Sequence, residues 1–512
     1  APRGVAAVRR TLAPPVAWRT RLRWVGMAAI PSSLILGTTS YLSTSIAAVP
    51  LLWVVPLAAY LLSFVLAFAR RPPLSPTTIR WAALASTLLV AASLLRVVPL
   101  PIAAQVAIHC GNLFAVALLV HRRLAAERPG VERLTEFYLL LSLGGVLGGA
   151  FNALAAPVLF DSIAEYPLAL ALAALVLPGR RALRGDVLVP TLYLAAVIGA
   201  LVVAGAMGTT AVRVVLALGV ASLLLLATRP VRLALCLAAL LALATFGGTS
   251  LHAERTFFGV VRVVEGERGE HVLTHGTTIH GRQRLTPRRR DDPLTYYTRQ
   301  GPLGQVFAAR RADLRRVAVI GLGAGSIAAY GRPGDTYTFY EIDPAVARIA
   351  RDRRWFTFLA DSRADVRIVI GDGRLRIAEA ASAEYDLIVV DAFSSDAVPA
   401  HLLTREAVEL YLQKLSPRGV VAFHVTNNHL DLTPVVAGIA RSLRLAGLEQ
   451  DDRVSEAARE NGANRSRWAV VARGEAALAG LDRRWEPLSA SPRDPVWTDQ
   501  FSNVLSVVEW SR

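Results

Sequence analysis

Three acidic residues in the second half of the chain come directly after, or within two residues of, short apolar runs that predict β-strands. They are Glu341, Asp372 and Asp391. Because ligands of open α/β sheets bind beyond the carboxyl ends of parallel strands, we expect these three carboxylates to lie together at one edge. A carboxylate can accept hydrogen bonds from sugar hydroxyls and amino groups, and it can remove a proton from an amine.

A glycine-rich turn precedes the first of these acids. The apolar run Val317–Ile320 leads into Gly321, Gly323 and Gly325, and a small-residue helix start is expected after them. Glu341 follows the next predicted strand about twenty residues later. Strand, glycines, strand and acid in this order predict a βαβ half-site for an adenosine compound. The glycines allow close approach of the backbone, and Glu341 accepts both ribose hydroxyls.

The other acids suit the remaining parts of such a ligand. Asp372, followed by Gly373, is placed to accept from an adenine amino group, and Asp391 would face the reactive carbon. If that carbon belongs to a sulfonium compound, catalysis needs alignment and a free amine. Asp391 and Asp396 could bind a cationic amine, and one of them could take its proton. The alternative is that Asp372 and Asp391 form turns or cap helices.

Two tyrosines and two histidines complete the candidates. Tyr296 and Tyr297 could wall an amine site through cation–π contact, although core packing explains them almost as well. His275 and His280 have no Cys or carboxylate partner at a metal spacing. No metal site is therefore predicted, and no disulfide framework either.

The first half of the chain is strongly apolar. The whole sequence is 53% hydrophobic, and its mean hydropathy is +0.42. Successive apolar runs are long enough to cross a hydrocarbon layer of about 30 Å. We expect spans at about 24–45, 47–68, 81–98, 102–120, 135–157, 164–178, 187–208, 211–228 and 232–248, of which the sixth and ninth are short.

Arginines are abundant in every second connection between these runs. Because positive charge is typical of the cytoplasmic side, this favours odd-numbered segments that begin on that side. Nine full spans would then place the second half of the chain outside. Adenosine sulfonium compounds are cytosolic, so we expect an even number of crossings instead. Within the runs, Gly144 and Gly148 predict close helix packing, and His109 predicts a hydrogen bond between helices.

The net charge of +17 does not indicate nucleic acid binding. The basic residues form neither a face nor a stripe interleaved with aromatic residues. Many arginines lie between apolar runs as topology signals. The one tight cluster, Arg288 to Arg290, is interpreted as a solvated loop.

The predicted fold is a multi-pass α-helical membrane domain followed by a small β-hairpin domain and an α/β Rossmann-like (class I methyltransferase-like) domain. Short β-like runs appear between 255 and 284, and strands alternate with helices from 302 onward. The expected boundaries are a basic flank over 1–23, a membrane domain of eight or nine helices over 24–250, a β-domain over 251–300 and a catalytic domain over 301–512.

Residues 255 to 512 resemble the spermidine synthase (polyamine aminopropyltransferase) family, and the whole chain is similar to its bacterial membrane-fused members. The resemblance rests on Gln283, Tyr296-Tyr297, the glycine turn, Glu341-Ile342-Asp343, Gly371-Asp372-Gly373 and the Asp391 loop. It implies decarboxylated S-adenosylmethionine as donor, a di- or polyamine as acceptor and 5′-methylthioadenosine as by-product. By position, it implies that Glu341 holds the ribose, Asp372 the adenine, Gln283 the donor and Asp391 the attacking amine.

Two departures keep the substrates open. The family usually has an acid inside the glycine turn, where this chain has Ala324, and two aspartates three apart, where Asp391 and Asp396 are five apart. Intact S-adenosylmethionine is therefore an alternative donor. A methyltransferase, or acceptor-free cyclisation or cleavage of S-adenosylmethionine, is an alternative reaction. A polyamine transporter with a nucleotide-sensing domain is an alternative of another class.

The resemblance also implies a setting for the protein. We expect a multi-pass protein of the bacterial cytoplasmic (inner) membrane with its catalytic domain on the cytoplasmic side. Its partners would be a small-molecule amine and the lipid bilayer, without nucleic acid or a metal. A homodimer is expected because soluble relatives commonly pair.

Overall fold

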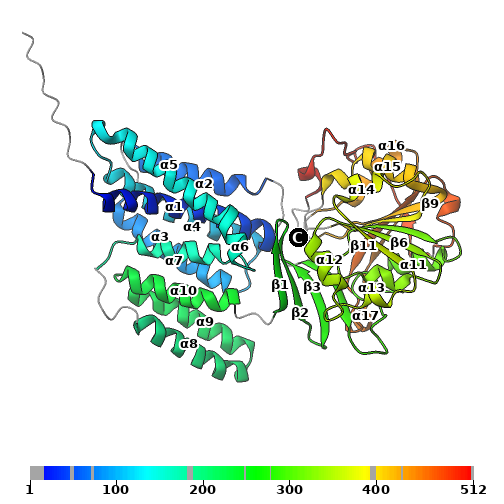
Figure 1. Cartoon of the computed structure of the whole chain (residues 1–512), viewed down its shortest axis with the longest axis horizontal. Coiled ribbons are helices and arrows are strands. Elements are labelled where there is room, and N and C mark those ends of the chain that lie inside the picture. Colours follow the sequence, from blue (N-terminus) through cyan, green and yellow to red (C-terminus); the bar gives the residue numbers. More distant parts are fainter. Residues whose placement is uncertain are drawn as a thin grey trace, which may run out of the picture. The chain divides into compact units, whose positions relative to one another are not determined.

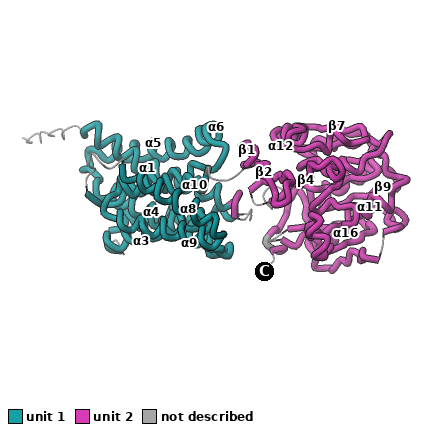
Figure 2. The backbone as a smooth tube through the Cα atoms, turned by 90° about the horizontal axis from the view of Figure 1, so that it is seen from below, with its two compact units in different colours: residues 1–42, 51–248 teal, residues 43–50, 249–512 magenta. Residues whose placement is uncertain are grey.

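The computed structural model describes residues 16–46, 51–70, 74–180, 188–246, 250–276, 278–392, 399–427, 430–481 and 483–508. The chain divides into two compact units, which are coloured separately in Figure 2. Residues 1–42 and 51–248 form the first unit, and residues 43–50 and 249–512 form the second. Each unit is described below by itself.

The described part of the first unit is helical throughout (Figure 1). Its α-helices are α1 (Trp18–Tyr41), α2 (Val54–Ala67), α3 (Pro76–Leu94), α4 (Ile102–Ala126), α5 (Leu134–Ala150), α6 (Ala156–Leu159), α7 (Glu165–Leu175), α8 (Leu188–Met207), α9 (Thr209–Ser222) and α10 (Pro230–Phe246). Each of the nine predicted spans overlaps one of these helices or, for 135–157, both α5 and α6, with bounds that differ by several residues.

Six helical segments of the described chain are long and apolar enough to cross a membrane. They are Trp18–Ile46, Pro76–Leu94, Ile102–Ala126, Val131–Leu159, Leu188–Met207 and Thr209–Leu226. The helices of the second, sixth and ninth predicted spans are shorter, at Val54–Ala67, Glu165–Leu175 and Pro230–Leu243. The sequence predicted the shortness of the last two and missed that of α2.

Helices α1 and α5 pack closely because glycines leave room between their backbones. A Cβ atom on Gly144 would collide with the carbonyl oxygen of Val25, and one on Gly148 with that of Ala29. The predicted close packing at these glycines is therefore confirmed. The predicted hydrogen bond of His109 is also present: its Nδ1 lies 2.6 Å from the hydroxyl of Tyr166.

The second unit begins with a small antiparallel sheet. Its strands follow chain order as β1 (Ser250–Thr256), β2 (Gly259–Glu265), β3 (Glu270–His275) and β4 (Thr278–Arg284). Their pattern of burial is mixed, and β1 carries mostly polar residues. The sequence-based prediction placed the start of the β-like region at residue 255, and it therefore missed most of β1.

A larger sheet of eight strands follows, in the order β12-β10-β11-β9-β8-β5-β6-β7. Five strands run parallel: β5 (Arg316–Ile320), β6 (Thr336–Glu341), β7 (Asp365–Ile370), β8 (Tyr385–Val390) and β9 (Leu415–His424). The antiparallel strands are β10 (Ala446–Asp452), β11 (Ser466–Ala472) and β12 (Glu486–Pro487). The chain leaves β5 toward β6 and β7 and returns to pair β8 on its other side, which creates a switch point where α/β folds bind ligands.

Helices cover both faces of this sheet. They are α11 (Pro302–Ala309), α12 (Pro344–Arg351), α13 (Phe358–Asp361), α14 (Gly373–Ala378), α15 (Arg405–Lys414), α16 (Thr433–Ser442) and α17 (Glu456–Glu460). Along β5, Val317 and Val319 join the apolar cluster that includes α11 and α12, whereas Ala318 and Ile320 join the cluster of α14 to α16. Burial on both faces is typical of a parallel sheet. The predicted fold class is confirmed.

One local expectation is wrong. No α-helix follows the glycine turn directly: Ser326–Tyr330 forms a short 3-10 helix, η5. It ends where Gly331 packs against Ser362 and Ala364, with no room for a Cβ atom. The tight contact and the glycine together end the segment after one short turn.

Candidate active site

A cavity of about 210 Å³ lies in the second unit, between the carboxyl ends of the parallel strands and the small sheet. The large sheet contributes Gly321, Leu322, Gly323, Glu341, Asp372, Gly373 and Asp391, and the small sheet contributes Phe258, Val261, Leu273, His275 and His280. The structure thus brings together six glycines and acids that the sequence assigned to the site, and the two histidines that it considered for a metal. Among the six, Glu341 is the last residue of β6, Gly373 is the first residue of α14, and the other four lie in the loops that follow β5, β7 and β8.

The glycine turn fits this place because a side chain could not. Gly321 has φ = 102° and Gly323 has φ = 53°, both in the region that favours glycine. A Cβ atom on Gly321 would meet the carbonyl oxygen of Asp391, and one on Gly323 that of His280. Gly325 does not line the cavity. It packs on Leu359, whose Cδ2 would lie 2.9 Å from a Cβ atom.

Glu341 is held in position by the backbone of the turn and of its own loop. Its Oε2 accepts a hydrogen bond from the backbone N–H of Leu322 at 2.9 Å, and its Oε1 accepts one from Asp343 at 2.8 Å. A carboxylate oxygen that accepts one hydrogen bond can accept a second from a ligand hydroxyl. Burial raises the pKa of Glu341 to about 7, against the effect of these hydrogen bonds. The carboxyl group is therefore poised to change its charge near neutral pH.

Asp372 combines two roles that the sequence left as alternatives. Its Oδ1 accepts from the backbone N–H of Leu375 at 3.0 Å and so caps α14, while its side chain lines the cavity. Its Oδ2 lies 2.9 Å from Nε2 of His401. His401 also lines the cavity and was not predicted, because it belongs to a distant loop.

The side chain of Asp391 is almost fully buried, and each of its oxygens has a partner. The hydroxyl of Tyr297 donates to Oδ2 at 2.5 Å, and Nδ1 of His424 lies 2.7 Å from Oδ1. His424 ends β9, and β9 pairs with β8 in a register that matches Phe423 with Val390. The sequence-based reading missed His424, although the rule that found Asp391 at the end of one strand points to the end of its neighbour.

The tyrosine pair lies behind this carboxylate rather than in the cavity wall. The pKa of Tyr297 is raised well above its ordinary value by burial and by the charge of Asp391. Its hydroxyl therefore stays protonated and donates. Tyr296 donates to the carbonyl of Ile279 at 2.5 Å, and its ring lies 4.4 Å from that of His424. Both tyrosines are placed to fix Asp391 and His424.

Gln283 is not among the residues that line the cavity. Its amide is fully buried, donates to Arg290 and Thr357, and accepts from the backbone of Thr357 at 2.8 Å. These bonds join β4 to the segment before α13, which leaves the amide committed to the fold. The donor contact of Gln283 stays a prediction. Asp396 lies outside the described residues.

No cluster of three or more His, Cys, Asp or Glu side chains that could hold a metal ion occurs in the described ranges. The polar groups of the cavity are instead carboxylates and imidazoles. These groups can accept hydrogen bonds from a nucleoside and donate hydrogen bonds to it, and the carboxylates can bind a cation.

Comparison with known proteins gives one curated relative. The chain is 38% identical to the polyamine aminopropyltransferase of Vibrio vulnificus (strain CMCP6) over 111 residues, which are 21% of this chain and 36% of that protein. The match thus spans about a third of the relative's length. It confirms the resemblance to the spermidine synthase family that the motifs predicted. No protein-family model matches the chain.

Solved structures that are similar to the chain include spermidine synthases. A probable spermidine synthase from Corynebacterium glutamicum ATCC 13032 has 15% identity and a TM-score of 0.36, and the match covers 49% of this chain and 97% of that one. Spermidine synthase from Thermotoga maritima has 13% identity and a TM-score of 0.33, with 49% and 82% covered. A spermidine synthase in complex with the transition state analogue AdoDATO has 13% identity and a TM-score of 0.32, with the same coverage.

Proposed function

We propose that the chain is an integral-membrane, spermidine synthase-like aminopropyltransferase. It transfers an aminopropyl group from decarboxylated S-adenosylmethionine to a di- or polyamine and releases 5′-methylthioadenosine. The observation that carries this proposal is the position of Asp391: it lines the cavity that Glu341 and Asp372 also line, and two buried partners hold its carboxylate. The likeness to a polyamine aminopropyltransferase supports it.

The proposed reaction assigns one task to each acid. Glu341 accepts the ribose hydroxyls, and Asp372, with His401, meets the adenine. Asp391 accepts a hydrogen bond from the acceptor amine, whose nitrogen attacks the methylene carbon next to sulfur. The carbon–sulfur bond breaks, its electrons remain on sulfur, and the amine proton passes to Asp391. Alignment supplies most of the acceleration because the sulfonium is already a good leaving group.

Two sulfonium compounds, decarboxylated and intact S-adenosylmethionine, are candidate donors. Ala324 is fully buried and packs with Val261, Leu273 and Phe356, so the glycine turn brings no carboxylate into the cavity. A donor amine would find no acid at that position. Intact S-adenosylmethionine is therefore the alternative donor, with methyl transfer or with acceptor-free cyclisation or cleavage as the alternative reaction.

The membrane setting belongs to the same proposal. The six long apolar helices support a multi-pass protein, and the cytosolic origin of both substrates supports a cytoplasmic catalytic unit in the bacterial inner membrane. An even number of crossings would satisfy both. A homodimer is part of the proposal by analogy with soluble relatives.

The test is incubation of the full-length protein with each donor, with and without putrescine, followed by mass analysis of the released nucleoside. Release of 5′-methylthioadenosine that requires both the decarboxylated donor and putrescine supports the proposal. S-adenosylhomocysteine would show a methyltransferase. Release of 5′-methylthioadenosine from intact S-adenosylmethionine without an amine would show the acceptor-free reaction.

A further inference from the structure

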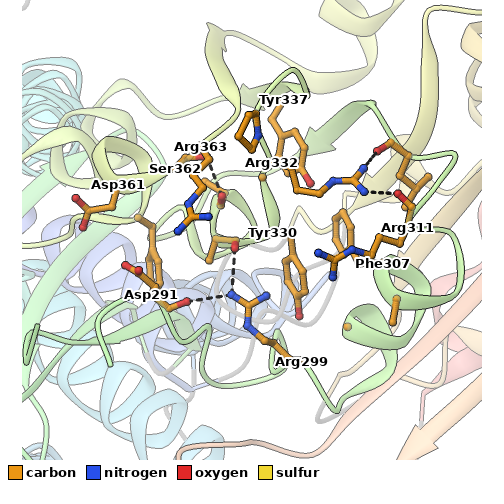
Figure 3. Close-up of a pocket in the computed structure, with 18 residues that line it drawn as sticks. Asp291, Arg299, Phe307, Arg311, Tyr330, Arg332, Tyr337, Asp361, Ser362 and Arg363 are labelled. Carbon is orange, nitrogen blue, oxygen red and sulfur yellow. Dashed lines mark hydrogen bonds between the residues drawn. The ribbon is translucent and has the colours of Figure 1, made fainter. Parts of the chain in front are cut away.

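The second unit has another cavity, of about 400 Å³. It shares no lining residue with the cavity of the candidate active site, which we call the nucleoside cavity. Its walls come from α11, η5, α13 and the loops before β5, β6 and β7 (Figure 3). These loops enter the parallel strands, so this cavity is near the amino ends of the strands. Its volume lies within the range of about 300 to 1,000 Å³ that small-molecule sites occupy.

The charged groups of this cavity leave an excess of positive charge. Arg299, Arg311 and Arg363 line it, and none of them forms an ion pair with a carboxylate within the described part of the chain. Figure 3 shows the three side chains around the cavity on three different segments, with Arg299 donating to the backbone carbonyls of Asp291 and Ala329. Three guanidinium groups without a carboxylate partner around one cavity suit a multiply charged anion, because a guanidinium can give parallel hydrogen bonds to phosphate oxygens.

The other charges of the cavity are already compensated. Arg332 pairs with the buried Asp335 at 2.9 Å. Asp361 lies 3.2 Å from Nε of Arg290, and Asp291 lies 4.0 Å from the same nitrogen. Asp361 also lies 3.4 Å from Nη2 of Arg353, so the two acids are paired with Arg290 and Arg353, and Arg299, Arg311 and Arg363 remain without a carboxylate partner among the described residues.

The framework of the cavity is fixed by hydrogen bonds and ring contacts. Arg299 donates to the carbonyl of Ala329 at 3.2 Å, and its guanidinium lies 5.3 Å from the ring centroid of Tyr330. Tyr330 in turn stacks on Phe307, with centroids 4.2 Å apart. Ser362, next to Arg363, donates to the carbonyl of Ala328 at 2.9 Å. These contacts hold the arginine-bearing segments together in the absence of a ligand.

Tyr330 connects this cavity to the candidate active site. Its hydroxyl donates to the carbonyl of Tyr297 at 2.6 Å, and the hydroxyl of Tyr297 donates to Asp391. Arg299 follows Tyr297 by two residues in the same segment. Gly325 of the glycine turn packs on Leu359 of α13, beside the cavity residue Phe358. A ligand that drew the arginines together would therefore pull on the segment that positions Asp391.

We propose that this arginine-lined cavity binds a small, phosphate-bearing anion, and that its occupancy changes the affinity of the nucleoside cavity through Tyr330 and Tyr297. Coupling between two sites is reciprocal, so each ligand shifts the affinity for the other by the same factor. The coupling half of the proposal rests on the proposed function; the binding half does not.

Binding is tested by titrating the full-length protein, in nanodiscs of zwitterionic lipid, with pyrophosphate at constant ionic strength and measuring the heat released. Combined replacement Arg311→Gln and Arg363→Gln should weaken binding about tenfold or more, because two charge-assisted contacts are lost. Arg459→Gln is the matched control, since Arg459 is equally exposed on α17 and lies outside the cavity lining. Equal affinities for the wild type and the double variant, or no binding at all, overturn the site.

The source of the phosphate is tested by repeating the titration in nanodiscs that contain phosphatidylglycerol. Loss of pyrophosphate binding there assigns the cavity to a lipid headgroup, and unchanged binding assigns it to a soluble ligand. Both results uphold a phosphate-binding site.

Coupling is tested by measuring the affinity for 5′-methylthioadenosine with and without saturating pyrophosphate. We expect a shift of at least threefold in the wild type. Tyr330→Phe keeps the ring but removes its bond to Tyr297, so this variant should bind pyrophosphate and lose the shift. An unchanged affinity in the wild type, or an equal shift in the variant, overturns the coupling. Neither binding measurement needs turnover, so failure of the transfer reaction would be seen separately.

Discussion

His424 and Asp391 face each other from the ends of neighbouring parallel strands, with Nδ1 of the imidazole 2.7 Å from Oδ1 of the carboxylate. Both side chains are nearly inaccessible to solvent. The imidazole therefore orients the carboxylate that we propose as the amine ligand. Since Tyr297 occupies the other oxygen, the geometry of Asp391 is fixed before any substrate enters.

Replacing Asp391 by Asn should remove activity and leave the fold intact. The amide keeps the size of the carboxylate but cannot accept the amine proton, and general base catalysis contributes about 10²- to 10⁴-fold. Release of 5′-methylthioadenosine should fall by about that factor, while calorimetry should still detect donor binding. Activity within twofold of the wild type would exclude Asp391 as the base.

His424 should affect turnover more than substrate affinity. His424→Ala removes the group that orients Asp391, and we expect kcat to fall about tenfold or more with little change in KM for the donor. His424→Asn places an amide N–H near the position of Nδ1 and should restore part of kcat. Equal losses in the two variants would mean that the imidazole only fills space.

Donor affinity should depend on pH through Glu341. Burial raises the pKa of this carboxyl group to about 7, so it becomes protonated as the pH falls below neutrality. A protonated carboxyl group accepts fewer hydrogen bonds from the ribose. Donor affinity, measured by calorimetry between pH 5.5 and 8.5, should therefore rise with pH around 7. Glu341→Gln should bind weakly at every pH, and Glu379→Gln, an exposed control, should follow the wild type.

The same group should lower conformational stability as the pH rises. Its folded-state pKa exceeds its unfolded value, so between these two values the folded state binds more protons than the unfolded state. The contribution of Glu341 to the free energy of unfolding is greatest below the unfolded pKa and is lost as the pH rises through 7. Thermal unfolding without donor checks this sign; greater stability at pH 8 than at pH 6 in the wild type and not in Glu341→Gln would contradict it.

The strands and acids of the second unit could be predicted because parallel, doubly covered strands are apolar along their whole length. β5 and β8 are buried throughout except for Arg316 and stand out in the sequence. Strand β10 does not, because its residues are mostly polar and half-buried at the antiparallel side of the sheet. Neither β10 nor β11 was predicted.

The histidines that contact the acids also include one that the sequence could predict and one that it could not. His424 follows from strand order, since β9 lies beside β8. His401 does not, because it lies in the short 3-10 helix Ala400–Leu402, 29 residues after Asp372, and no strand pairing places it. Gln283 is a motif residue whose amide is hydrogen-bonded to Arg290 and Thr357 and which lies outside the cavity lining. A sequence pattern reports residue types, whereas hydrogen-bond saturation is decided by the surrounding fold.

The glycines of α5 give a prediction with an internal control. Gly148→Ala should destabilise the first unit by about 1 to 3 kcal/mol, because its Cβ atom would collide with the carbonyl of Ala29 on α1. Gly145→Ala, three residues earlier on the same helix, meets nothing within 4 Å. It should be neutral or slightly stabilising, since alanine favours helix over glycine. Thermal unfolding in detergent compares the two. Equal changes in both variants would mean that helix propensity, and not the contact with α1, sets the stability at these positions.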